Sequence, residues 1–385
     1  MLRETDPQAS LTLWEALLPE EARRLPAELA AVDAYLDDER FLAPWRALFN
    51  RRLGRPSVPI DTLLRARKLR VDTTVVEADI DYPTDADLLE HAIRKLGGLV
   101  RRIKGRGAAS RTRFRDRGRA PGRRMKQLAR TRRRRTGVAM AEVDRLTGEV
   151  ARLARRTLRE VQVVARNARR ALTRRPGDGR LGRLVGELEE TIGLTGRLLA
   201  QTDQRLAGNR VIPDRVVSLA DPDARPIRKG KPQHPTQFGY TLLLAADECG
   251  FIADHQLQRG NPSDAPQLVP AIQRVIALTG RPPGTVVGDR GFGTAANDQA
   301  VQALGVRRVG LQRNGTPGKA RLALERTRRF RRLRTWRVGI EARISQLKRA
   351  FGLRRTRLRR LGGARIWVGL GIFAYNLQRM TVVAG

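Results

Sequence analysis

Three acidic side chains of this chain, Asp72, Asp289 and Glu341, fall at positions suited to chemistry on a charged substrate. Asp289 directly follows the apolar run TVVG, and Asp72 lies in the Val- and Thr-rich stretch LRVDTTVVEADI, so both belong to predicted strands. Glu341 lies in RVGIEARISQLKRAFG, a predicted helix. In open α/β sheets, ligands collect beyond the carboxyl ends of the strands. Three carboxylates gathered there predict a site for two Mg²⁺ ions about 3.5 to 4 Å apart, the arrangement used in phosphodiester chemistry.

The chain is strongly basic. Its 385 residues include 77 Lys and Arg against 39 Asp and Glu, which gives a formal net charge of +38 and a pI near 11.7. Arg side chains bind phosphate oxygens well, so this excess predicts nucleic acid as the partner. The alternative is a general bias toward Arg that leaves these charges solvated. In residues 101–135 the only acid is Asp116, and such a block of like charge predicts a loose segment until an anion binds.

Other classes of site are excluded by composition. One cysteine and three scattered histidines build neither a disulfide framework nor a Cys/His zinc site. The first residues lack the basic and apolar regions of a signal peptide, and the apolar run of residues 366–377 is too short to span a bilayer. We therefore expect a cytoplasmic, nucleoid-associated protein without membrane contact, and we predict a buried helix for that run.

Hydrophobic periodicity predicts helices around one strand in the first half of the chain. Apolar residues recur at helical spacing in residues 11–49, whereas residues 69–80 alternate as a strand. A helix capped by Thr84 or Asp85 is predicted next. Its inward face carries Leu89, Ile93 and Leu96. Further on, two amphipathic helices in residues 141–172 and 181–206 predict an antiparallel helical hairpin.

Strands and helices alternate in the second half. The predicted strands are residues 215–220, 238–247, 251–260, 285–289 and 306–312. The predicted helices are residues 263–280, closed by Gly280, and residues 295–305, followed by the late helix of Glu341. This order predicts an α/β fold with a mixed sheet and flanking helices.

The predicted organisation has three parts. Residues 1–65 form a small N-terminal helical segment. Residues 66–98 and 211–385 form the sheet domain, and residues 99–210 form a large basic helical insertion. Exposed loops of a domain tolerate such insertions.

Several motifs recur in order along the chain, and together they resemble a bacterial insertion-sequence transposase of the ISNCY-like group, with a DDE-type, RNase H-like catalytic domain. The resemblance spans roughly residues 70–380. The matching text is RVDTTVVEADIDYPTDADLLEHAIRKL, SLADPDARPIRKGK, FGYTLLLAAD, RGNPSDAPQLVPAI, GDRGFG and RISQLKRAFGLRRTRLRRLGGARIWVGLGIFAYNLQRM.

The resemblance implies a reaction and its catalytic residues. Asp72, Asp289 and Glu341 would be the catalytic acids and the ligands of two Mg²⁺ ions, or of Mn²⁺. The enzyme would cut DNA at the element ends and join the freed 3′-hydroxyl to target DNA. A homo-oligomer would pair the two ends in a synaptic complex.

The resemblance also implies residues that bind DNA. Related transposases carry a Tyr, Arg, Glu, Lys signature in which Arg precedes Glu by four positions and Lys follows it by seven. Arg337 and Lys348 fit this spacing around Glu341, while Arg334 takes the place of the tyrosine. Helical spacing puts the three fitting residues on one face. The predicted DNA contacts are Arg290, Arg334, Trp336, Arg337 and Lys348.

Alternatives remain for the first acid and for the function. Asp221, Asp223 and Asp247 compete with Asp72, although Asp beside Pro is more typical of turns. Similar proteins usually have a longer helical stretch between the segments GRPSVP and RVDTTVV than this chain has. The shorter connection predicts an internal deletion and a truncated DNA-end-binding region. The chain would then be a catalytically inactive DNA-binding remnant. A third alternative is a stand-alone RNase H-like nuclease that cuts without joining.

Overall fold

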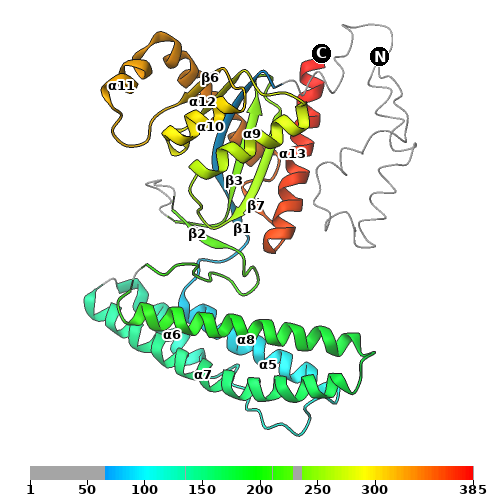
Figure 1. Cartoon of the computed structure of the whole chain (residues 1–385). Helices are drawn as coiled ribbons and strands as arrows, with labels where there is room; N and C mark the ends of the chain where they lie inside the picture. Colours follow the sequence, from blue (N-terminus) through cyan, green and yellow to red (C-terminus); the bar gives the residue numbers. More distant parts are fainter. Residues whose placement is uncertain (1–65, 135, 210, 229–235, 385) are drawn as a thin grey trace.

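The computed structural model describes residues 66–384, apart from 135, 210 and 229–235. Figure 1 shows two units: a sheet flanked by helices and, below it, a bundle of long helices. The chain leaves the sheet after its first strand, forms the bundle and then returns to complete the sheet. The helical segment predicted for residues 1–65 lies outside the described residues.

A mixed sheet forms the centre of the first unit. Within the described residues it has seven strands, in the order β2-β3-β1-β5-β6, with β4 also paired to β3 and β7 to β1. β3 runs antiparallel to β1, whereas β5 and β6 run parallel to it. The predicted α/β fold with a mixed sheet is confirmed. The strands are β1 (Lys68–Ala78), β2 (Arg225–Ile227), β3 (Gln237–Asp247), β4 (Ile252–Arg259), β5 (Thr285–Gly288), β6 (Arg308–Leu311) and β7 (Arg355–Thr356).

Helices cover both faces of this sheet (Figure 1). One face packs against α9 (Leu268–Thr279) and α10 (Ala295–Ala303), and the other against α12 (Arg328–Ala350) and α13 (Arg360–Ala384). A short helix, α11 (Lys319–Arg326), precedes α12. As predicted, α9 ends at Gly280, whose φ of 69° is left-handed and therefore favours glycine.

The period of two along β1 sorts its side chains between these faces. Leu69 and Val71 are fully buried on the α9 face. Val76 and Ala78 are buried on the α12 and α13 face. Asp72 has the same parity as this second pair, so the strand directs it toward α12.

The second unit is built from four helices. They are α5 (Asp85–Gly105), α6 (Gly122–Thr131), α7 (Gly137–Thr173) and α8 (Gly179–Leu206). As predicted, Thr84 caps α5 through its side-chain oxygen, which accepts the N–H of Asp87 at 3.3 Å. The predicted pair of amphipathic helices is also confirmed, because α7 and α8 are joined by a short turn and bury a continuous apolar face.

The predicted domain boundary at residue 98 is wrong, because it falls inside α5. Leu89 and Ile93 of this helix are completely buried against α7 and α8. The whole helix therefore belongs to the bundle by its packing, and only β1 precedes the insertion in the sheet unit.

The prediction of a loose segment in residues 101–135 is also wrong. Ion pairs hold the connection between α5 and α6: Arg117 Nη2 lies 2.6 Å from Glu160, and Arg106 Nη2 lies 3.0 Å from Asp178. The hydrogen bond from Arg117 lowers the pKa of Glu160. These acids come from α7 and from the cap of α8, far along the chain. The charges within residues 101–135 alone therefore could not predict these ion pairs.

Two predicted elements differ from the observed ones. Residues 215–220 form no strand, because the side-chain amide of Gln201 binds both the N–H (3.0 Å) and the carbonyl (3.1 Å) of Val216. The run of residues 366–377 is helical but only half-buried, since Leu370 on α13 is 50% exposed whereas Val368 is fully buried. In the part of the chain described, none of the helices combines the length and the apolar character needed to cross a bilayer.

Gly239→Ala is expected to destabilise the sheet. Gly239 has a φ of +157° opposite Glu77, and a Cβ there would lie 2.2 Å from the carbonyl oxygen of Val76. We expect a loss of at least about 2 kcal/mol in the free energy of unfolding, measured by urea denaturation. The control Gly186→Ala, at an open helical site of α8, is expected to stabilise by about 0.5–1 kcal/mol. Equal effects of both changes would contradict this account.

Candidate active site

The pairing of β1 with β5 brings two of the predicted acids to one edge of the sheet. Val71 lies opposite Gly288 in this parallel pair, and Asp72 and Asp289 are the next residues of the two segments. Neighbouring strands lie about 4.8 Å apart. The two residues therefore lie side by side, Asp289 at the carboxyl end of β5 and Asp72 beside it within β1. Their predicted placement is confirmed, and their catalytic role remains a prediction.

Backbone groups fix both carboxylates. Asp72 Oδ1 accepts the N–H of Thr73 at 2.7 Å, and the Asp72 side chain is only 13% exposed. Asp289 Oδ1 accepts the N–H of Gly291 at 2.9 Å and so caps the 3₁₀ turn η4 (Arg290–Phe292). Each carboxylate is thus oriented by the residues that follow it.

One arginine links two of the three acids. Arg337 Nη1 lies 3.3 Å from Asp72 Oδ2, and Arg337 Nη2 lies 3.0 Å from Glu341 Oε1. Arg337 and Glu341 are four residues apart on α12 and therefore share a face. Glu341 is 58% exposed, whereas Asp72 is nearly buried. The guanidinium thus lies between the inner and the outer carboxylate.

The donors at this edge suit a hard divalent cation. Mg²⁺ and Mn²⁺ prefer carboxylate oxygens. Asp289 supplies them from the carboxyl end of β5, and Asp72 supplies them from the middle of the neighbouring strand β1. Glu341 is held apart from them through Arg337. Accordingly, no group of three His, Cys, Asp or Glu side chains within the described ranges is placed to hold one metal ion. Two of the three predicted ligands are therefore adjacent, and the third is not.

Asp264 is a further carboxylate at this edge that the sequence interpretation missed. It precedes the turn η3 (Ala265–Gln267). A Cβ on Gly291 would lie 2.7 Å from Asp264 Oδ2 and 3.1 Å from Asp289 Oδ1. Both carboxylates therefore border the same glycine, and only glycine leaves them room. Asp264 does lie in one of the quoted motifs, RGNPSDAPQLVPAI, but nothing in its spacing pairs it with Asp289.

The predicted DNA contacts differ in exposure. Arg290 and Arg334 are exposed, and Lys348 is half-buried on α12. Trp336 is also half-buried. The guanidinium of Arg70 lies 4.4 Å from the centre of its indole ring and donates to its carbonyl oxygen at 3.3 Å. A cation of the protein therefore already contacts the indole of Trp336, which the sequence predicted as a DNA contact.

The three competing acids serve other parts of the structure. Asp221 Oδ1 accepts the N–H of Arg360 at 3.0 Å, and Asp223 Oδ2 accepts the N–H of Leu361 at 3.1 Å. Both therefore hold the start of α13. Asp247 closes the turn between β3 and β4 at the opposite, amino-terminal end of β1. None of the three lies beside Asp289.

Comparison with known proteins gives one match. Residues 206–377 match the family model described as the transposase DDE domain. This segment contains Asp289, Glu341, Arg337 and Lys348, whereas β1 with Asp72 precedes it and joins it only through strand pairing. No curated protein and no solved structure matches the chain.

Asp247→Asn is expected to stabilise the protein in a pH-dependent way. Burial raises the pKa of Asp247 from 3.8 to about 6, so above that pH the folded state carries a buried charge at a cost. The variant should be more stable at pH 8, by at most about 3 kcal/mol. This advantage should shrink as the pH falls from 6 to 4, because the native carboxyl is then protonated.

Urea denaturation at several pH values measures this difference. The control Asp79→Asn changes a 61% exposed carboxylate just beyond β1 and should shift stability by less than about 0.5 kcal/mol. An advantage of Asp247→Asn that stays constant or grows toward pH 4 would contradict the assignment.

Proposed function

We propose that the chain is a DDE transposase of the insertion-sequence type, which cuts DNA at the ends of a mobile element and joins the freed 3′ ends to target DNA. The match of residues 206–377 to the transposase DDE domain supports this proposal. The observation that best supports this proposal is the adjacent placement of Asp72 and Asp289 at the carboxyl end of β5. The mixed α/β sheet is consistent with the RNase H-like fold of these enzymes.

The proposed reaction has two transfers at phosphorus. A water oxygen attacks the phosphate at the element end, the bond to the 3′-oxygen breaks, and the water proton passes to solvent. This leaves a 3′-hydroxyl. That hydroxyl then attacks a phosphodiester of the target and displaces its 3′-oxygen. The second transfer makes one bond for each that it breaks and therefore needs no added energy source.

Enzymes of this family use divalent metal ions. We assign two Mg²⁺ ions, replaceable by Mn²⁺, to the edge that carries Asp72 and Asp289, with Glu341 as the third acid. When bound, such ions activate the nucleophile and stabilise the leaving oxygen. The chain's own part is to hold Asp72 and Asp289 through Thr73 and Gly291 and to keep Arg337 beside the outer acid.

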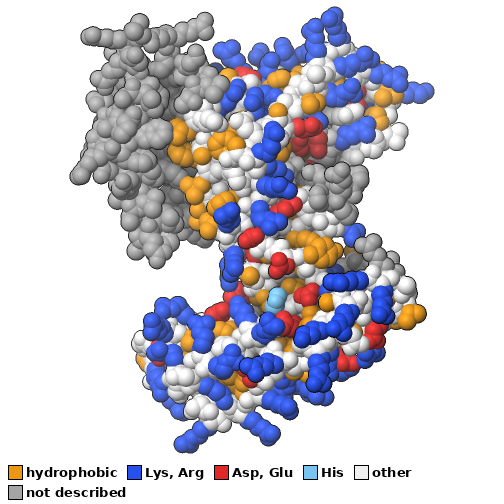
Figure 2. Space-filling model, turned by 180° about the vertical axis from the view of Figure 1, so that it is seen from behind, with side chains coloured by type: hydrophobic (Ala, Val, Ile, Leu, Met, Phe, Trp, Pro, Cys, Tyr) orange, Lys and Arg blue, Asp and Glu red, His pale blue; other side chains and the backbone are white. Residues whose placement is uncertain are grey.

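Positive charge supports DNA as the substrate. Lys and Arg side chains are spread over both units on the face shown in Figure 2. We assign Arg290, Arg334, Arg337 and Lys348 as phosphate contacts. Each contact releases counterions, so DNA affinity should fall steeply with salt. We further propose that a homo-oligomer pairs two element ends, on the strength of the family resemblance.

Asp289→Asn is expected to abolish cutting while DNA binding is kept. The purified chain is incubated with Mg²⁺ and a duplex that carries the inverted repeats flanking its gene. Loss of the carboxylate should slow nicking at least about a thousandfold. The control Asp79→Asn, seven residues after Asp72 and just beyond the end of β1, should cut like the parent.

The same assay separates the proposed function from its alternatives. Cutting without joining by the parent would indicate a nuclease, and binding without cutting would indicate an inactive remnant. Cutting by Asp289→Asn at the parent rate would overturn the assignment of the site itself.

A further inference from the structure

A cationic groove lies at the edge of the sheet opposite the carboxylates. Its volume is about 560 Å³. Lys68, Thr285 and Arg308 line it, and they are the first residues of β1, β5 and β6. The groove is therefore built by the amino-terminal ends of three parallel strands. Asp72 lies four residues further along β1, and Asp289 directly follows β5.

The amino-terminal half of α12 forms the other wall of this groove. Arg328, Arg329 and Arg332 line it together with Trp336. The Nζ atom of Lys68 lies 5.8 Å from the centre of the Trp336 ring. The groove thus joins cations from two strands, β1 and β6, and from one helix, which are distant in sequence.

No acid among the described residues compensates these cations. Among the residues with described positions, none of Lys68, Arg308, Arg328, Arg329 and Arg332 has a carboxylate oxygen within 4.0 Å. A carboxylate at this edge, Glu248, instead accepts the backbone N–H groups of residues 67 and 68. The groove therefore presents its charges to solvent.

The start of α12 adds to the positive potential. A helix begins with a partial positive charge, and acids in its first turn usually balance it. The first turn of α12 has no acid and begins with Arg328 and Arg329. Such an arrangement is unfavourable by itself and becomes favourable when an anion binds.

The chemistry of the lining favours a phosphate backbone. Among the described residues that line the groove, the hydroxyl of Thr285 is the only side-chain oxygen, so nearly all of the polar groups are cationic donors. Phosphate oxygens accept from such donors at every nucleotide, whereas a base edge offers a guanidinium two acceptors mainly at guanine, so this lining favours the backbone.

We propose that this groove binds the backbone of the DNA strand whose reactive phosphate lies at Asp72 and Asp289. This inference rests on the proposed function, because it takes DNA as the ligand. From Arg328 to Arg337, which contacts Asp72, α12 rises about 13.5 Å, at about 1.5 Å per residue. Phosphates of one strand are about 3.4 Å apart along a duplex, so the far end of the groove contacts DNA about four nucleotides from the cut.

The experiment maps which arginines the DNA covers. The full chain, in EDTA to prevent cutting, is treated with phenylglyoxal with and without a 30-base-pair duplex, and modified arginines are identified by mass spectrometry. Arg328, Arg329 and Arg332 should react in the free protein and be protected in the complex. In parallel, Arg328→Gln/Arg332→Gln should lower the slope of log affinity against log salt by about 1.8.

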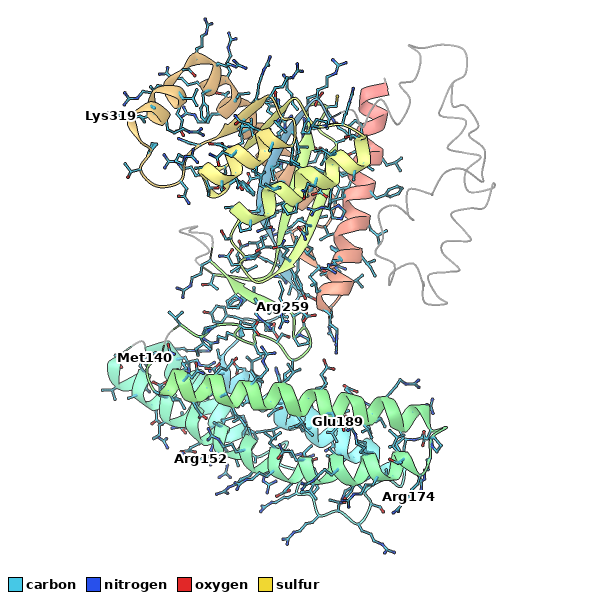
Figure 3. All side chains as sticks on the ribbon, viewed as in Figure 1. Met140, Arg152, Arg174, Glu189, Arg259 and Lys319 are labelled. Atoms are coloured by element: carbon cyan, nitrogen blue, oxygen red, sulfur yellow. The ribbon has the colours of Figure 1, made fainter. Side chains whose placement is uncertain are left out.

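A matched pair controls for net charge. Arg170→Gln/Arg174→Gln removes two exposed arginines at the end of the helical unit that lies far from the sheet (Figure 3). This pair should lower the slope less than the groove pair. An equal fall in both variants, or unprotected groove arginines in a DNA complex, would overturn the inference and leave the proposed function standing. A parent chain that binds no duplex would instead contradict the proposed function.

Discussion

The parallel pairing of β1 with β5 is the constraint on which the candidate site depends. The two strands are separated by the entire helical unit in sequence, yet their register sets Asp72 beside Asp289. A slip of one residue would turn every side chain of β1 to the other face. Leu69, Val71 and Val286, all fully buried on the α9 face, oppose that slip. The apolar core thus positions the acids.

The helix α12 is the second constraint, because it carries chemistry to both edges of the sheet. It approaches the sheet closely where side chains are missing: a Cβ on Gly310 would lie 2.9 Å from Leu333, and one on Gly339 would lie 2.0 Å from Arg70. Arg70 is buried there beneath Trp336, and burial lowers its pKa. From this position α12 places Arg337 against Asp72 and its first arginines in the cationic groove.

Local patterns predicted much of the fold, and long-range contacts account for most of the errors. The alternation in β1, the cap at Thr84 and the left-handed Gly280 were all visible in the sequence. The sequence placed Asp72 and Asp289 at strand positions but could not show that Arg337 separates Glu341 from them. Likewise, the partners that order the arginine-rich segment, such as Glu160, come from another helix. Tertiary contacts of this kind leave no periodic signal.

The central claim is that Asp72 and Asp289 act as one unit on the same phosphate. The most direct measurement compares single-turnover DNA cutting by Asp72→Asn, by Asp289→Asn and by the double variant. Groups that act as a unit give strongly non-additive effects. The account predicts that the double variant is no slower than the slower single variant. Rate losses that multiply, or a parent-like rate for Asp72→Asn, would contradict it.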